Sequence, residues 1–399
     1  MRVLVVLALA AYPALYHLLT QSPVGVEAET LLPRMDTMVA LLYFGLFAVS
    51  FDFISGYTGY LSFGHAAFYG TGAYFVVLVA NGKIPLVPSG TPFMITLLCA
   101  GLVAALLAVG IGLVSFRLSG VYFAMITLGF AQVLYVFVRG LEWISSNPRD
   151  GASVSGSTHP EGFEVGVPFV DGLNLAIGPL SGDTVTLLGH TLGTNAVSFY
   201  LVGAVVLACY LAMQRIIHSP FGQVMVAIRD NEERAEAIGY DTFRYKMGAF
   251  VTSGFFAGVA GGLFAGFRRS VTPENTFYFL VTGDALLASI IGGFGTLAGP
   301  IFGHFFDESI REFLSPAGQG GGLLPYLQTR LSEGVLSAEV GGLTVEGFIE
   351  AALNGHASLY VGIVFVLFVL YVPNGLVGAA RDRLGGPVTE KLPDRLWDR

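Results

Sequence analysis

Long apolar runs recur along most of this 399-residue chain, and they constrain its fold more than any other feature. A helix needs about 20 such residues to cross the roughly 30 Å of hydrocarbon in a bilayer. Only 12% of the residues are charged, against roughly 25% in soluble domains. The runs are residues 2–20, 37–55, 60–80, 93–115, 121–141, 196–217, 247–267 and 356–373. They predict an all-α integral membrane protein, because a membrane β-barrel would instead alternate apolar and polar residues.

The glycine-rich region 278–306 is long enough for one or two further crossings. We expect it to cross twice, which gives a polytopic bundle of about ten transmembrane helices in one domain, residues 1–399. The alternative is eight crossings and a re-entrant loop. Residues 1–20 are expected to form a retained first helix, and a cleavable signal peptide is the alternative.

Basic residues predict the orientation, because cytoplasmic loops are enriched in lysine and arginine close to the helix ends. Twelve of the 20 basic residues are Arg2, Arg117, five within 215–246 and five after Leu376. These parts, including the tail 376–399, are predicted to be cytoplasmic. In two long loops the charged residues are mostly acidic, and these loops are predicted to lie outside. They are an extracytoplasmic loop at 142–195 and an extracytoplasmic insertion at 307–355.

The segment 215–246 concentrates ten charged residues, five basic and five acidic, between two apolar runs. This balance argues against a simple anchor to lipid headgroups, which is built from basic clusters. We therefore expect residues 218–246 to form a cytoplasmic loop with a helix that docks on another protein, and a solvated linker helix is the alternative. Its apolar residues are expected to enter a groove in that partner. They are Val224, Val226, Ala227 and Ile228.

Glycines four residues apart predict close helix packing. Gly254, Gly258, Gly262 and Gly266 share one helix face, and Gly295, Gly299 and Gly303 repeat the spacing. Such faces let helix backbones approach closely in lipid. Packing within one subunit is the simpler interpretation, and a moving interface or a second copy of the chain is the alternative.

A break in the helical pattern is predicted at residues 56–65, where Gly56, Gly59 and Gly64 weaken the helix. Non-helical backbone at membrane depth is tolerated only where protein or a water-filled cavity satisfies it. This segment is therefore a candidate wall of a pathway. The apolar runs also contain few ionisable side chains, among them Asp52, His65 and Asp284. Each is expected to face the bundle interior, a water-filled space or the membrane interface.

A nucleotide-binding P-loop requires a lysine followed by serine or threonine. The three lysines, Lys83, Lys246 and Lys391, are followed by isoleucine, methionine and leucine. The chain is therefore not expected to hydrolyse ATP, and the histidine spacing predicts no zinc-peptidase site. We expect no catalytic, cofactor-binding or metal-binding residues.

Several stretches carry a resemblance to a known family. They are GYTGYLSFGHAAFYGTGAY at 56–74, RLSGVYFAMITLGFAQVL at 117–134, SPFGQVMVAIRDNEERAEAIGYDTFRYKMGAFVTSGFFAGVAGGLFA at 219–265, IIGGFGTLAGPIFG at 290–303 and VPNGLVG at 372–378. The chain resembles the LivM-type permease subunits of ABC importers for branched-chain amino acids. It is also similar to the permeases of urea and short-amide importers.

The resemblance implies that residues 229–239 form the coupling helix, which docks on a cytoplasmic ABC ATPase. The docking residues that it implies are Arg229, Asp230, Asn231, Glu232, Glu233, Arg234, Ala235 and Gly239. The sequence departs from the family's Glu-Ala-Ala…Gly loop, because Glu232-Glu233-Arg234-Ala235 stands where an alanine pair is expected. Gly239 is kept.

The expected function is a permease subunit of an ABC importer in a prokaryotic cell membrane, translocating branched-chain amino acids. The partners implied are the ATPase, a second homologous permease and an extracytoplasmic solute-binding protein, with no nucleic acid. Alternatives are a urea or short-amide permease, and, in another class, a stand-alone ion-coupled carrier or channel. The candidate pathway residues are Gly59, Ser62, His65, Tyr122, Thr127 and Asp284.

Overall fold

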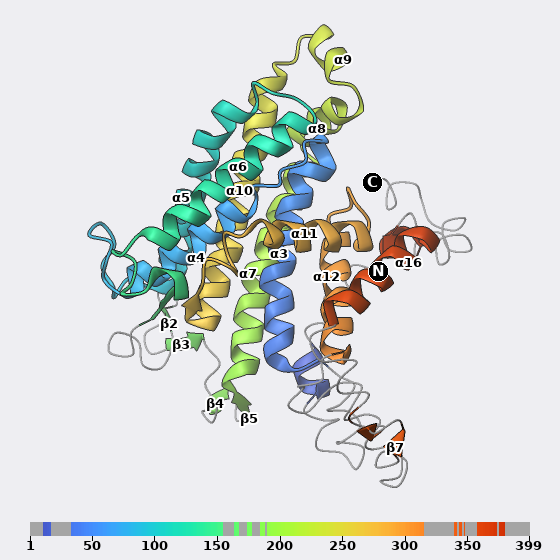
Figure 1. Ribbon diagram of the computed structural model, residues 1–399. Helices are drawn as coiled ribbons and strands as arrows, with labels where there is room; N and C mark the ends of the chain where they lie inside the picture. Colours follow the sequence, from blue (N-terminus) through green and yellow to red (C-terminus); the bar gives the residue numbers. More distant parts are fainter. Residues whose placement is uncertain are drawn as a thin grey trace. The chain divides into compact units, whose positions relative to one another are not determined.

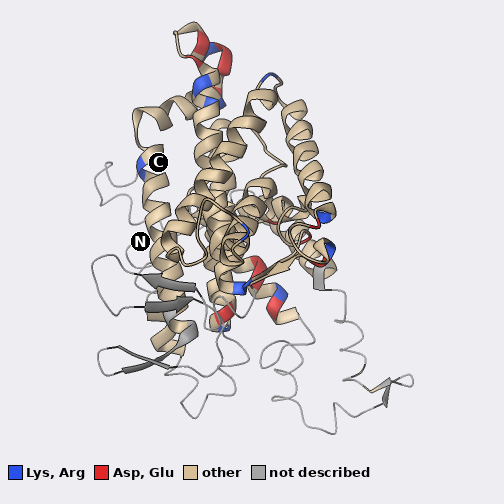
Figure 2. Ribbon diagram, turned by 90° about the vertical axis from the view of Figure 1, so that its left-hand side faces the viewer, with Lys and Arg blue, Asp and Glu red and all other residues tan. Residues whose placement is uncertain are grey.

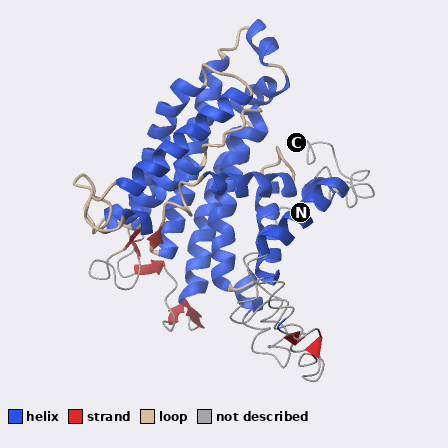
Figure 3. Ribbon diagram, viewed as in Figure 1, coloured by secondary structure: helices blue, strands red, loops and turns tan. Residues whose placement is uncertain are grey.

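The structure is a computed structural model that describes residues 11–16, 33–154, 163–166, 174–177, 184–187, 190–314, 339–340, 343–344, 347, 357–372 and 375–379. The described residues are mainly helical (Figure 3). The chain divides into two compact units, residues 39–304 with 374–399, and residues 1–38 with 305–373. Most of the predicted crossing 2–20, the tail 376–399 and the insertion 307–355 lies outside the described residues, as does part of the loop 142–195.

Helices make up most of the described part of the chain (Figure 1). The helices are α3 (Met35–Thr58), α4 (Ala66–Ala80), α5 (Phe93–Ser115), α6 (Val121–Gly140), α7 (Thr194–Ile217), α8 (Pro220–Asp230), α9 (Glu232–Ala237), α10 (Thr242–Arg268), α11 (Phe279–Gly292), α12 (Gly299–Leu314) and α16 (Ala357–Tyr371). Within the described residues, five helices are long and apolar enough to cross a membrane, and three shorter apolar helices accompany them. The prediction of an all-α polytopic membrane protein is therefore confirmed.

Short antiparallel strand pairs occur only outside these helices in the described part of the chain. The pairs are β1 (Ala152–Ser153) with β6 (Ser270–Val271), β2 (Phe163–Gly166) with β3 (Asn174–Ile177), β4 (Thr184–Leu187) with β5 (His190–Gly193), and β7 (Glu339–Val340) with β8 (Leu343–Thr344). A 3₁₀ helix, η1 (Pro148–Asp150), precedes β1. The β1–β6 pair joins the segment that follows α6 to the residues that follow α10.

The glycine face of α10 packs against α5 within the chain. A Cβ at Gly254 would lie 2.8 Å from the Ala108 Cβ atom, and one at Gly258 would lie 2.4 Å from that of Ala104. Further along the helix, Gly262 faces Leu97 and Gly266 faces Phe93 in the same way. The residue numbers run in opposite directions on the two helices, so α5 and α10 are antiparallel. Small residues bring the two backbones close, as expected for packing in lipid.

The second glycine series does not form one helix face, contrary to expectation. Gly295 lies in the turn between α11 and α12 with φ of 76°, so it is not part of either helix. Only Gly299 and Gly303 belong to α12, and a Cβ at Gly303 would lie 1.8 Å from the Ala288 carbonyl of α11. The four-residue spacing was misleading here, because the first glycine of the series, Gly295, belongs to a turn and not to a helix.

The unit of residues 39–304 and 374–399 has two ends, which α10 connects. The 27 residues of α10 span about 40 Å at 1.5 Å per residue. One end, here the coupling end, holds α8, α9, the α5–α6 turn and the α11–α12 turn (Figure 1). The opposite end holds β6, β1 and the α4–α5 connection, where the Asn81 amide donates to the Ser153 carbonyl at 2.9 Å. Gly375 packs against Gly293, so the tail begins at the coupling end.

The other unit contains the start of α3, the later part of α12 and α16. Arg311 forms an ion pair with Asp307 one turn earlier on α12, with 2.8 Å between Nε and Oδ2. The rings of Phe306 and Phe368 lie 5.5 Å apart and join α12 to α16. Thr37 also donates to Glu312 at 3.4 Å. These contacts attach α3 and α16 to α12.

Candidate coupling site

The charged segment folds as two short helices, α8 and α9, followed directly by α10 (Figure 2). Pro220 begins α8, where its missing N–H is not needed. Asn231 ends α8 and caps α9, because its side chain accepts a hydrogen bond from the Arg234 N–H at 2.8 Å. Gly239, with φ of 98°, then turns the chain toward α10. Residues 229–239, expected to form one coupling helix, are instead the end of α8 and the short α9, because Asn231 between them is extended. They are here called the coupling segment.

The apolar face of α8 is turned into the chain and not toward a partner. Val224 and Ile228 are only 6% and 3% exposed, and α8 contacts α7 and α10. The expectation that Val224 and Ile228 enter a partner's groove is therefore wrong, whereas Val226 and Ala227 are partly exposed. An amphipathic pattern shows that one face of a helix is buried but does not say by what. Here the chain's own helices bury it.

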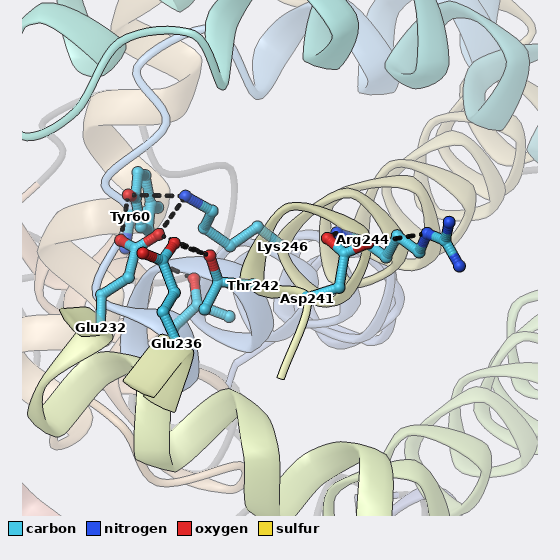
Figure 4. Close-up of polar contacts among 8 residues, drawn as sticks. Tyr60, Glu232, Glu236, Asp241, Thr242, Arg244 and Lys246 are labelled. Atoms are coloured by element: carbon cyan, nitrogen blue, oxygen red, sulfur yellow. Dashed lines mark hydrogen bonds and ion pairs between the residues drawn. The ribbon is translucent and has the colours of Figure 1, made fainter. Parts of the chain in front are cut away.

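Glu232 attaches α9 to two other elements (Figure 4). Its carboxylate forms an ion pair with Lys246 of α10 and accepts a hydrogen bond from the Tyr60 hydroxyl at 2.6 Å. Thr242 bridges Glu232 and Glu236, with its hydroxyl 3.0 Å and 2.7 Å from their carboxylates. The side chain of Lys246 is 8% exposed, so its charge needs this partner.

The charges in this cluster support one another. Burial opposes the charged form of Glu232, but hydrogen bonds from Lys246 and Tyr60 outweigh it and lower the pKa of this carboxyl. The Tyr60 hydroxyl donates to Glu232 and accepts from Lys246, so it bonds to both charged partners. The Lys246 ammonium also lies 4.8 Å from the centre of the Tyr60 ring, within cation–π range.

Arg229, at the end of α8, caps α3. Its guanidinium donates to the Gly56 carbonyl at 2.8 Å, one of the last carbonyls of α3, which lack partners within the helix. A cation is favourable there because the carboxyl end of a helix carries partial negative charge. The same guanidinium lies over Gly295, where a Cβ would be 3.2 Å away. Arg229 therefore joins α8 to the end of α3 and to the α11–α12 turn.

Asp52 connects the same two regions from inside the bundle. It is fully buried, and its Oδ1 atom accepts a hydrogen bond from the Gly295 N–H at 2.9 Å. A Cβ at Gly56 would lie 2.5 Å from this oxygen. The Gly59 and Gly295 turns both lie beside Arg229, whose side chain is 3.3 Å and 3.2 Å from the Cβ positions of the two glycines.

The predicted break in the helix is present. Residue Thr58 ends α3, Gly59 has φ of 78°, and helix resumes only at Ala66. The intervening residues 59–65 are here called the broken segment. Ser62 and His65 in it are fully buried, and the His65 Nε2 atom lies 3.2 Å from Ser50 and 3.3 Å from Ser253.

The broken segment also contacts α6. A Cβ at Gly64 would lie 2.1 Å from the Thr127 carbonyl, so only glycine allows this approach. Of the candidate pathway residues, Ser62, His65 and Thr127 are thus buried around the broken segment. Tyr122 is instead 70% exposed on α6. Asp284 is partly exposed on α11, two residues after Thr282, whose hydroxyl accepts from the Ala66 N–H at 2.8 Å.

Exposed residues of the coupling segment and its continuation form a mixed surface. Ile238 is 69% exposed, and Tyr240 and Phe243 are also exposed. Glu233 and Arg234 lie in the same stretch and are exposed, whereas Glu232 is half-buried and Ala235 is buried. Of the eight predicted docking residues, Arg229, Glu232 and Ala235 make contacts within the chain, and Asn231 caps α9. The other four, Asp230, Glu233, Arg234 and Gly239, are exposed.

Within the residues that the structure describes, no group of three or more His, Cys, Asp and Glu side chains is arranged to hold a metal ion. Tyr60 and Lys246 belong to the site but were not among the residues predicted for it. A signal was present for Lys246, because it is one of three lysines in the chain and adjoins an apolar run. Tyr60 offered none, since aromatic residues are common beside membrane helices.

The sequence matches one family model and several known proteins. Residues 34–336 match the family model described as "Branched-chain amino acid transport system / permease component". The chain is 27% identical over 286 residues to the high-affinity branched-chain amino acid transport system permease protein LivM of Escherichia coli, covering 70% of this chain and 63% of that protein. It is 26% identical to LivM of Salmonella typhimurium, covering 66% and 59%.

A more distant relative is the probable branched-chain amino acid transport permease protein LivH of Methanocaldococcus jannaschii, 28% identical over 34% of this chain and 42% of that protein. The chain spans less than two thirds of the length of the two LivM proteins, 63% and 59%. No solved structure matches it.

Proposed function

Because the chain belongs to the family of permease components of branched-chain amino acid transport systems, we propose that it is the membrane permease subunit of an ABC importer. It is a multi-pass prokaryotic membrane protein with relatives in bacteria and an archaeon. In this proposal it translocates branched-chain amino acids that an external solute-binding protein delivers. A separate cytoplasmic ATPase binds ATP and drives the cycle, and a second homologous permease completes the pathway.

The observation that carries this proposal is the two-sided construction of the coupling segment. Its inward residues, Arg229 and Glu232, bond to the ends of membrane helices. Its outward residues, with Ile238 foremost, form an apolar and charged surface that suits a protein partner. A segment attached in this way to the bundle is suited to pass a partner's movement to the membrane helices.

The pathway is proposed to run beside the broken segment. Ser62, His65 and Thr127 are buried polar residues there, and buried polar groups in membrane helices mark such pathways. The chain itself is proposed to have no enzymatic activity and no cofactor, because ATP binds to the partner ATPase.

The docking surface is tested by replacing Ile238 with aspartate. We expect Ile238→Asp to abolish co-purification of the ATPase subunit of the proposed importer, because it places a charge in the apolar part of the interface. Leu86→Asp is the matched control, since Leu86 is 92% exposed in the connection after α4 at the opposite end. Equal recovery of the ATPase with both variants would remove the docking surface from the proposal.

Substrate and class are tested by reconstitution in liposomes. Labelled leucine should enter only when ATPase, second permease and binding protein are all present, and excess urea should not compete. Competition by urea would favour the amide-transporting relatives of the family. Uptake by this chain without the ATPase would instead establish a stand-alone carrier or channel.

A further inference from the structure

Tyr60 lies where several elements of the chain meet. It follows Gly59 in the broken segment, and its hydroxyl donates to Glu232 of α9 and accepts from Lys246 of α10 at 3.1 Å. Its ring packs edge-on against Phe116 after α5 and Phe123 of α6, with ring centres 5.5 Å and 5.2 Å apart. One side chain thus connects the coupling segment, the broken segment and α6.

The attachment of α9 to Tyr60 resists separation. Moving Glu232 away would leave Lys246 buried without its counter-ion, beside the rings of Tyr60 and Phe116. A buried charge without a partner is strongly unfavourable. Glu232 and Lys246 therefore move as a unit when α9 moves. Tyr60 follows them, because its hydroxyl would otherwise lose its hydrogen bonds to both.

The broken segment can follow such a movement. Its backbone is not helical, and it connects two rigid helices, α3 and α4, as hinges commonly do. Displacing Tyr60 would shift Ser62 and His65, and the side-chain atoms Ser62 Oγ and His65 Nδ1 make no hydrogen bond in the structure. Gly64 would carry the shift to Thr127 of α6 through their close contact.

We infer that Tyr60, held by Glu232 and Lys246, is a positioning residue that transmits movement of the coupling segment to the broken segment and α6. This inference rests on the proposed function and assigns a role that docking alone does not require. It separates the coupling segment into an outward surface that binds the ATPase and an inward cluster that converts docking into movement of the pathway.

The test uses the complete importer in liposomes, with uptake of labelled leucine and hydrolysis of ATP measured together. Tyr60→Phe keeps the ring and removes the hydroxyl, and Glu232→Gln removes the charge. We expect both variants to assemble with the ATPase but to lower leucine uptake per ATP hydrolysed. The expected decrease is about 5- to 150-fold, the range typical of coupling between two sites in a protein. Glu142→Gln is the matched control, because Glu142 is exposed after α6, outside the coupling segment and its docking surface.

Two substitutions of Lys246 distinguish loss of transmitted movement from failure to fold. Lys246→Arg keeps the cation and should retain most uptake per ATP, whereas Lys246→Met should lose it at equal membrane insertion. If Lys246→Met does not insert, Tyr60→Phe and Glu232→Gln decide the question. Unchanged uptake per ATP in these two would overturn the inference, and loss of ATPase binding would assign Glu232 to docking instead. No uptake by the wild-type importer would remove the proposed function, and the inference with it.

Discussion

At the scale of single residues, Arg229 caps the end of α3, a role that its position in a charged loop does not indicate. The last carbonyls of α3 lack helical partners, and Arg229 bonds to that of Gly56. Its side chain also lies over Gly59 and Gly295, where any larger residue would crowd it. A charge that appears to belong to a solvated loop thus stabilises the end of a membrane helix.

Removing this cap should destabilise the unit. We expect Arg229→Gln to lower the free energy of unfolding by roughly 0.3 to 2 kcal/mol, the usual range for a cation at a helix carboxyl end. Arg234→Gln is the control, because Arg234 is exposed and substitutions at such sites usually stay within about 0.5 kcal/mol. Thermal unfolding of the purified protein in detergent measures both. Equal midpoints for the two variants would show that the Gly56 contact adds no stability.

At the scale of helices, α10 is held by glycines on more than one face. Gly254 and Gly258 lie on the face of α10 that packs against α5. On another face, a Cβ added at Gly261 would lie 1.9 Å from the Tyr69 carbonyl oxygen of α4. Gly72 of α4 lies equally close to the Gly258 carbonyl. α10 is therefore the central helix of its unit, and the absence of side chains at these positions allows both neighbours to pack against it.

Filling one of these contacts should separate α4 from α10. A Cβ at Gly72 would lie 2.0 Å from a backbone oxygen, which cannot move aside as a flexible side chain can. We expect Gly72→Ala to destabilise the protein by about 1 to 3 kcal/mol, the usual effect of overpacking. Gly110→Ala on α5 is the control, because nothing lies within 4 Å of its Cβ position.

The control should change stability in the other direction. Alanine is favoured over glycine in a helix interior by roughly 0.5 to 1 kcal/mol, so Gly110→Ala should leave the unfolding midpoint unchanged or raise it. Thermal unfolding in detergent compares the two variants. A midpoint for Gly72→Ala as high as that for Gly110→Ala would contradict the close packing of α4 on α10.

At the scale of the whole unit, the two ends of α10 should lie on opposite sides of the membrane. Arg234 lies at the coupling end and Leu86 in the connection at the opposite end. In a background without Cys99 and Cys209, we expect Arg234→Cys to react with a membrane-impermeant maleimide only in inside-out vesicles. Leu86→Cys should react only in intact cells. Labelling of both positions from the same side would contradict the predicted orientation.

The sequence by itself determined the class of fold and the position of most helices. Apolar runs near 20 residues predict membrane helices, because a helix satisfies its backbone within itself and a membrane β-barrel would alternate apolar and polar residues. Residues 93–115 and 121–141 match α5 and α6 closely. The glycines of 56–65 correctly predicted a break, because glycine weakens a helix wherever it stands. The similarity of the charged segment to a family motif predicts that residues 229–239 form the coupling segment.

Only the tertiary structure decided which surface each residue faces. The apolar residues Val224 and Ile228 pack inside the chain, and Glu232 turns inward to Lys246 while its neighbour Glu233 remains exposed. Periodicity gives the faces of a helix, but the partner of each face depends on elements distant in sequence. Tyr60 and Lys246 are 186 residues apart along the chain and meet only after folding.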